Sequence, residues 1–116
     1  MIRPSNHSLK VYLYASPMDM RKQIDGLATT VEHDMHLNPS GKSLFVFMNK
    51  RRDKIKVLVW EKNGYVLWYK RLEKHRFAKL KNDRPTLSVK ELNMLLDGYD
   101  IDKFKPHDAV NFDHIA

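Results

Sequence analysis

The amino-acid sequence predicts an α+β fold: an antiparallel β-meander of three to four strands, one helix packed on a face of the sheet, and a second, C-terminal helix. Three observations predict it. The middle of the chain holds three β-rich runs, at 44–49, 55–60 and 65–72. Apolar residues at helical spacing precede these runs, and a helix-capping pattern follows them. Helices that are segregated from a run of strands in this way are typical of α+β proteins.

The size and composition of the chain limit its architecture. With 116 residues, of which 42% are hydrophobic, it suits a single domain over 1–116, with an ordered core at about 10–100 and loose N-terminal and C-terminal tails. It has no cysteine, so disulfides, cysteine-based metal sites and thiol nucleophiles are excluded. No run approaches the roughly 20 apolar residues of a membrane span. We therefore expect a soluble, cytoplasmic protein without a membrane partner.

The N-terminal third predicts one strand followed by one helix. The run 10–15 is rich in β-forming residues, and Ser16, Pro17 and Asp19 then resemble a helix start with a cap, a first-turn proline and a carboxylate. Apolar residues continue from there at helical spacing and predict one buried helix face. The members of this stripe are Met20, Ile24, Leu27, Ala28, Val31 and Met35.

The three central runs predict a meander with two tight turns. Asn63-Gly64 lies between the second and third runs and is a strong hairpin signal, because both residues tolerate positive φ. The turn at 49–54 joins the first two runs and carries four cations around Asp53. The sequence therefore predicts a hairpin with a basic tip.

The C-terminal third predicts a second helix. Ser88 and Glu91 have the spacing of a capping box, and Gly98 is suited to end the helix. Leucines at 92, 95 and 96 supply its apolar face. We expect this helix at an edge of the sheet or on the same face as the first, which would leave the other face partly open.

Positive charge is concentrated in the middle of the chain. Residues 42–84 hold 14 Lys/Arg against 4 Asp/Glu, whereas 1–41 hold 4 against 4 and 85–116 hold 3 against 6. A basic block in an otherwise neutral or acidic chain predicts a positive patch, and nucleic acid is the commonest partner of such a patch.

Aromatic residues alternate with these cations, so bases could stack while lysine and arginine neutralise phosphates. The same aromatics, Trp60, Trp68 and Tyr69, are alternatively core or dimer-interface residues, and a homodimer is one use of an exposed sheet. The cations at the hairpin tip alternatively only face solvent and contact no phosphate. The candidate nucleic-acid contacts are Lys50, Arg51, Arg52, Lys54, Lys56, Trp68, Lys70, Arg71, Lys74 and Arg76.

No catalytic constellation is recognisable in the sequence. Glycines are scattered, so no phosphate-binding loop is present, and the basic block has few carboxylates to gather a divalent metal. We therefore expect a non-catalytic protein without catalytic residues, metal ligands or cofactor. An alternative is a small metal-dependent nuclease that uses His33 and His36, which are spaced i and i+3, together with Asp34. No residue further along the chain is a convincing additional ligand for this group.

Several motifs, in order, resemble one protein family. They are PMDMRK at 17–22, DGL at 25–27, LFVF at 44–47, RRDKIK at 51–56 and LWYKRLE at 67–73, followed by Phe77. The chain resembles, over about 10–100, the Orf2-like (TnpB) accessory proteins of the insertion sequence sixty-six family. The resemblance implies a bacterial mobile-element protein that assists transposition, while a separate transposase carries the strand-transfer chemistry.

Two functions follow from the charge pattern and the resemblance. In the first, the protein is a DNA-binding accessory factor that holds element DNA, at its ends or non-specifically, through the basic hairpin surface. In the second, it is an interaction module that bridges transposase subunits or other element-encoded proteins without direct DNA contact. In that case its basic face would meet an acidic protein surface.

Overall fold

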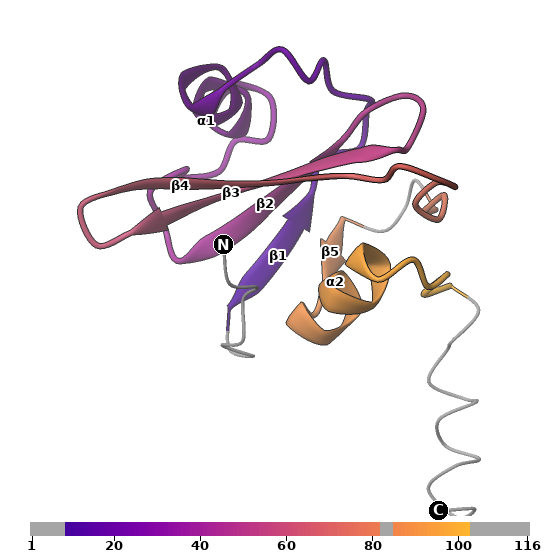
Figure 1. The fold of residues 1–116 in the computed structure, drawn as a ribbon. Coiled ribbons are helices and arrows are strands. Elements are labelled where there is room, and N and C mark those ends of the chain that lie inside the picture. Colours follow the sequence, from indigo (N-terminus) through magenta and orange to yellow (C-terminus); the bar gives the residue numbers. More distant parts are fainter. Residues whose placement is uncertain (1–8, 82–84, 103–116) are drawn as a thin grey trace, which may run out of the picture.

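The computed structural model describes residues 9–81 and 85–102, which form a five-stranded sheet with one helix on each face (Figure 1). The predicted loose tails fall mainly on 1–8 and 103–116, outside the described residues. The elements, in chain order, are β1 (Lys10–Leu13), α1 (Ile24–His33), β2 (Ser43–Met48), β3 (Lys54–Glu61), β4 (Gly64–Arg71), β5 (Thr86–Leu87) and α2 (Val89–Leu96).

The strand order is β4-β3-β2-β1-β5. The α+β class is confirmed, and β2, β3 and β4 form the predicted antiparallel meander. The sheet has five strands rather than three to four, and it is mixed, because β1 pairs parallel to β2 and antiparallel to β5. A parallel pair needs a long crossover connection, and the chain from β1 through α1 to β2 supplies it.

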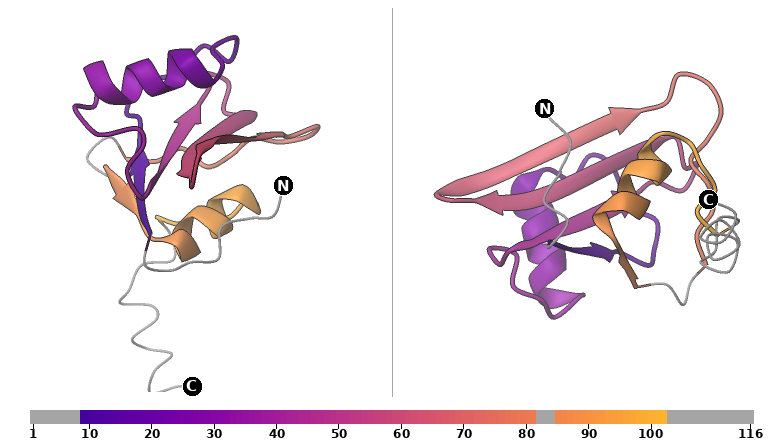
Figure 2. Two further views of the ribbon diagram at one scale, coloured as in Figure 1. Left: turned by 90° about the vertical axis from the view of Figure 1, so that its left-hand side faces the viewer. Right: turned by 90° about the horizontal axis from the view of Figure 1, so that it is seen from below.

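The expected position of the second helix is wrong. α2 covers the sheet face opposite to α1, so the sheet is the middle of three layers (Figures 1 and 2). The cause lies in β2, where Leu44, Phe45, Val46 and Phe47 are all 1% exposed or less. A strand that is apolar at successive positions faces a core on both sides. Neither face of the central strands is therefore open.

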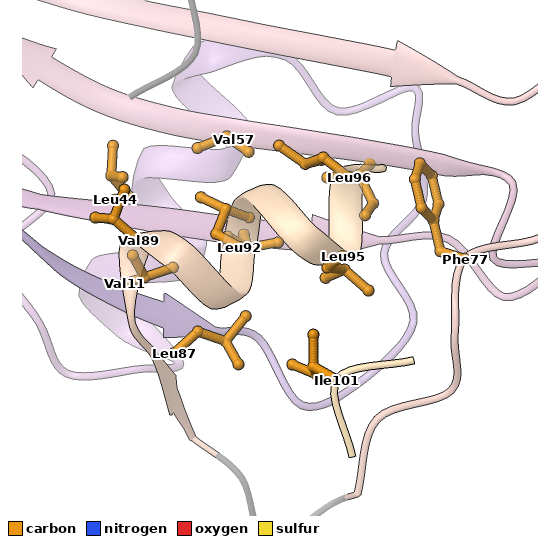
Figure 3. Close-up of a cluster of buried hydrophobic side chains, with 12 residues drawn as sticks. Val11, Leu44, Val57, Phe77, Leu87, Val89, Leu92, Leu95, Leu96 and Ile101 are labelled. Carbon is orange, nitrogen blue, oxygen red and sulfur yellow. The ribbon is translucent and has the colours of Figure 1, made fainter. Parts of the chain in front are cut away.

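The two faces have separate cores. On one face, Leu27 and Val31 of α1 pack on Phe45, Phe47 and Leu58 of the sheet. On the other face, the three buried leucines of α2 meet apolar residues of β1, β2 and β3, with Phe77 and Ile101 at one end of the cluster (Figure 3). We call this second cluster the α2-face core. Ile101 is 2% exposed, so packed structure reaches slightly past residue 100.

The first helix begins later than predicted. Ser16 and Pro17 do not start it, and α1 begins at Ile24 after the extended residue Gln23. The backbone before it is held in other ways, because Met18 N–H donates to Met48 O (2.9 Å) and Arg21 N–H donates to Asp19 Oδ1 (2.9 Å). An aspartate that accepts a hydrogen bond from the backbone two residues on favours a turn over a helix.

The second helix has the predicted caps. Ser88 Oγ accepts from Glu91 N–H (3.0 Å), and Glu91 Oε1 accepts from Ser88 N–H (2.9 Å), which completes the capping box. At the other end Gly98 has φ 94°, and its N–H donates to Leu95 O while Tyr99 N–H donates to Met94 O. These two bonds form a Schellman motif, which satisfies carbonyls that the helix leaves free.

The Ser88 cap gives a first testable prediction. Ser88→Ala removes the acceptor for Glu91 N–H, and we expect the free energy of unfolding to fall by about 1 kcal/mol. Ser88→Asp retains a capping oxygen and should keep most of this stability. Urea unfolding of the three proteins measures the difference, and equal losses in the two variants would contradict a capping role.

The β3–β4 hairpin forms where Asn63-Gly64 predicts one, but the turn lies one residue earlier. Glu61 pairs with Gly64, so Lys62 and Asn63 are the two loop residues. Lys62 has φ 54°, and Asn63 N–H donates to Glu61 O (2.6 Å). The hairpin is confirmed, and the residue with positive φ is a lysine rather than the expected Asn-Gly pair.

Candidate nucleic-acid interface

The Asn49 side chain makes three hydrogen bonds within the β2–β3 turn, in addition to the backbone bonds that close it. Its Oδ1 accepts from the N–H groups of Asp53 (3.1 Å) and Lys54 (3.0 Å), and its Nδ2 donates to Asp53 Oδ1 (2.6 Å). The bond from Asn49 is the main cause of a lowered pKa at Asp53, with the charges of Lys54 and Arg51 adding to it. The turn's one acid is thus ionised and engaged inside it, and the exposed tip residues are Lys50 and Arg51.

The segment that follows β4 is hydrogen-bonded to this turn. Leu72 N–H donates to Asp53 O and Phe77 N–H donates to Arg52 O, each at 2.7 Å. Arg52 Nε donates in return to Phe77 O (3.2 Å), and the Phe77 ring is 1% exposed in the α2-face core. This segment therefore lies beside the β2–β3 turn, on the right of Figure 1.

Together, residues 49–54 and 71–81 form what we call the basic end of the sheet. It holds nine Lys/Arg against the two acids Asp53 and Glu73. Glu73 is engaged by Arg71, whose Nε donates to Glu73 Oε2 (2.8 Å) and whose pKa is raised by that bond. The nine cations of the basic end thus outnumber its two acids, both of which are already engaged, and the remaining positive potential attracts polyanions.

The structure brings most of the predicted site residues together. The exposed ones at the basic end are Lys50, Arg51, Arg71, Lys74 and Arg76. Arg52 is half-buried beside Phe77, and Lys54 is half-buried with its Nζ 3.9 Å from Asp53 Oδ1. Lys54 and Arg71 are also cross-strand partners, which joins the turn to the end of β4.

Lys56 lies opposite Tyr69 on the neighbouring strand, but its side chain is buried. It is 3% exposed, and its Nζ donates to Met20 O and Lys22 O, both at 2.8 Å. The same atom lies 5.3 Å from the centre of the Tyr69 ring, within the range of a cation–π contact. Burial lowers its pKa, against the opposing effect of Asp19. Lys56 anchors the loop that leads into α1, so we leave it outside the interface.

Lys70 and Trp68 also face inward, toward α2. Lys70 Nζ donates to Leu96 O (2.7 Å), a carbonyl at the C-terminal end of α2 where a cation is favourable. Trp68 is half-buried against the α2-face core. Both side chains connect β4 to α2, and they too are left outside the interface.

Three residues of this region are not among the candidate contacts chosen from the sequence, although Tyr69 was considered there as a stacking residue. Tyr69 is 49% exposed and shares a strand face with Arg71, so strand alternation alone could have selected it. Lys79 and Lys81 are exposed beyond Phe77. No local pattern reveals that their segment returns to the β2–β3 turn, because the hydrogen bonds that place it join residues 52 and 77.

The histidine-based alternative gains no support from the geometry. Among residues 9–81 and 85–102, no three His, Cys, Asp or Glu side chains are grouped as metal ligands. Asp34 instead accepts from the Tyr14 hydroxyl (3.3 Å), and burial together with this carboxylate raises the pKa of Tyr14. The helices in the described ranges are too short or too polar to cross a membrane.

Comparisons with known proteins agree with the motifs. Residues 9–106 match the family model described as IS66 Orf2-like protein. The uncharacterized protein y4jC of Sinorhizobium fredii (strain NBRC 101917 / NGR234) is 31% identical over 107 residues, which cover 90% of this chain and 91% of the relative. The uncharacterized protein y4hO of the same strain is 31% identical over 99 residues, covering 84% and 86%. No solved structure matches the chain significantly.

Proposed function

Because the chain belongs to the IS66 Orf2-like family, which supports an accessory role in transposition, we propose that it binds the DNA of its insertion sequence through the basic end of the sheet. The protein acts in the cytoplasm and is not catalytic, and the strand-transfer chemistry belongs to a separate transposase. DNA is held at the element ends or along its length, chiefly by phosphate contacts.

One observation carries this proposal: two segments far apart in the sequence, 49–54 and 71–81, are hydrogen-bonded to each other and present their exposed cations at one end of the sheet. If the cations of the β2–β3 turn served only to keep it soluble, nothing would require a second basic segment to be fixed beside them. Phosphate contacts of lysine and arginine supply sequence-independent affinity for DNA. Tyr69 adds an exposed aromatic ring next to Arg71, which is suited to contact a sugar or base.

The experiment compares two variants that lose the same charge. The first removes four exposed cations of the basic end: Lys50→Ala, Arg51→Ala, Lys74→Ala and Arg76→Ala. The matched control removes four exposed cations elsewhere: Lys10→Ala, Lys42→Ala, Lys62→Asn and Lys90→Ala. Asparagine is used at 62 because it tolerates the positive φ found there.

Fluorescence anisotropy measures binding to duplex from the element end and to scrambled duplex over a salt series. We expect the log–log salt slope to become shallower by roughly 3 to 4 in the first variant, at about 0.9 per lost phosphate contact, and by less than about 1 in the control. No wild-type binding at low salt would overturn the proposal. The basic end would then be a surface for an acidic protein, with the transposase as the first partner to test.

A further inference from the structure

A cleft of about 360 Å³ opens beside the basic end. Its walls come from the end of β1 and the loop after it, the end of β2, the β2–β3 turn, and the segment 79–81 with Pro85. This volume lies at the small end of the range of roughly 300–1,000 Å³ that is typical of small-molecule sites. A duplex is far too wide to enter a cavity of this volume, so the cleft favours a single small group such as one unpaired base.

The lining of the cleft combines two chemistries. One part is apolar and comes from Leu13, Pro17, Val46, Met48, Leu80 and Pro85. The other part is cationic: Lys50, Arg52, Lys79 and Lys81 line the cleft, and none of the described lining residues is a carboxylate. An apolar interior accommodates a planar base, and cations at its border neutralise a phosphate.

The aromatic group in the wall is held in place. The Tyr14 ring packs on Phe47 with the ring centres 5.7 Å apart, and its hydroxyl donates to Asp34 Oδ2 (3.3 Å). Arg52 is fixed in the same way by its bond to Phe77 O (3.2 Å). Both side chains are therefore ordered before any ligand arrives, which reduces the entropic cost of binding.

The geometry points to a binding site for one unpaired nucleotide, whose base enters the cleft and whose phosphate meets the lysines at 50, 79 and 81. The ligand is a nucleotide of single-stranded DNA, such as a frayed or cleaved element end; a free mononucleotide has the same chemistry. This inference deepens the proposed function and rests on it, because the basic end would then hold the adjoining duplex.

The test uses the full-length protein and nuclear magnetic resonance. Titration with pentathymidylate should shift the backbone amides of cleft residues, including Ala15, Ser16 and Lys81, and leave those of Lys42 and Lys62 in place. Thymidine monophosphate forms a second arm that separates the sources: equal affinity for both identifies a free nucleotide, and tighter binding of the oligonucleotide identifies a strand. Inorganic phosphate forms a third arm. Equal shifts at equal affinity with phosphate alone would overturn nucleotide recognition.

Two variants and one control sharpen the result. Ala15→Trp fills the cleft from an exposed position, so the fold should tolerate it, and we expect pentathymidylate binding to weaken about tenfold, as when one stacked base is lost. The pair Lys79→Ala/Lys81→Ala should weaken it by a similar factor at low salt, and the pair Lys10→Ala/Lys42→Ala by less than about twofold. Unchanged binding in both cleft variants would overturn this site. Duplex binding measured by anisotropy would remain intact in that case, so the two proposals can fail separately.

Discussion

Phe77→Ala is expected to lower the free energy of unfolding by about 3 to 5 kcal/mol, the range for removing a fully buried aromatic ring. The ring is 1% exposed and lies at one end of the α2-face core, near Leu95 and Leu96 (Figure 3). Its backbone N–H bonds to Arg52 O, and its own carbonyl accepts from Arg52 Nε. The substitution therefore removes core volume at the point where the basic segment is attached to the β2–β3 turn.

Urea unfolding measures this loss, and Phe77→Leu is the control, because it restores much of the volume and should recover more than half of the stability. Amide hydrogen exchange gives a second readout, because the effect should be confined to residues near position 77. In Phe77→Ala the amides of 74–79 should exchange with solvent faster than in the wild type, whereas those of the β3–β4 turn should not. A loss below about 1 kcal/mol would mean that the segment is held by its hydrogen bonds alone.

Lys56→Met is expected to lower the free energy of unfolding by about 2 kcal/mol, within the range for a lost hydrogen bond to a charged group. Methionine retains an unbranched stem of similar length, but it cannot donate to Met20 O and Lys22 O. The variant therefore removes the two bonds that hold the loop before α1, together with the cation–π contact to Tyr69. Lys54→Met is the control, since the Lys54 ammonium has only a 3.9 Å approach to Asp53 and should cost less than about 0.5 kcal/mol.

The pH dependence of the difference in stability between the wild type and Lys56→Met tests the charge of Lys56. Burial lowers the pKa of Lys56 below its ordinary 10.5, so the folded protein binds this proton less tightly than the unfolded chain. Between the two pKa values the unfolded state carries more protons, and stability then rises with pH. The stability advantage of the wild type over Lys56→Met should therefore grow as pH rises toward 10.5 and be constant well below the folded pKa. An advantage that shrinks in this range would contradict the assigned pKa direction.

Local sequence patterns predicted the helices and strands of this fold better than they predicted which distant segments pair with each other. The meander, the capping box at Ser88 and Glu91, and the apolar stripe of α1 each depend on residues a few positions apart. The start of α1 was wrong because Asp19 satisfies a turn that competes with the helix. The parallel β1–β2 pair and the two-residue β5 were missed because pairing between distant segments leaves little local trace.

The candidate site was predictable to a similar degree. Charge density identified the β2–β3 turn, but density cannot separate a lysine that faces solvent from one that donates to backbone carbonyls. Lys56 and Lys70 have the same alternating neighbours as exposed strand cations, and each finds its acceptors on a helix-associated segment at least 26 residues away in sequence. Those acceptors exist only once the layers have assembled.

The strand order also has a consequence for synthesis on the ribosome. β1 is made first, yet it lies between β2 and β5, and β5 pairs only with β1 within the described sheet. While Thr86 and the residues after it are still inside the ribosome, the nascent chain can already form the meander and pack α1 on one face of it. Its other sheet face, with Val46, Ile55 and Val57, would then be uncovered apolar surface of the kind that chaperones recognise. We therefore expect this face to be covered only after β5 and α2 have both left the exit tunnel.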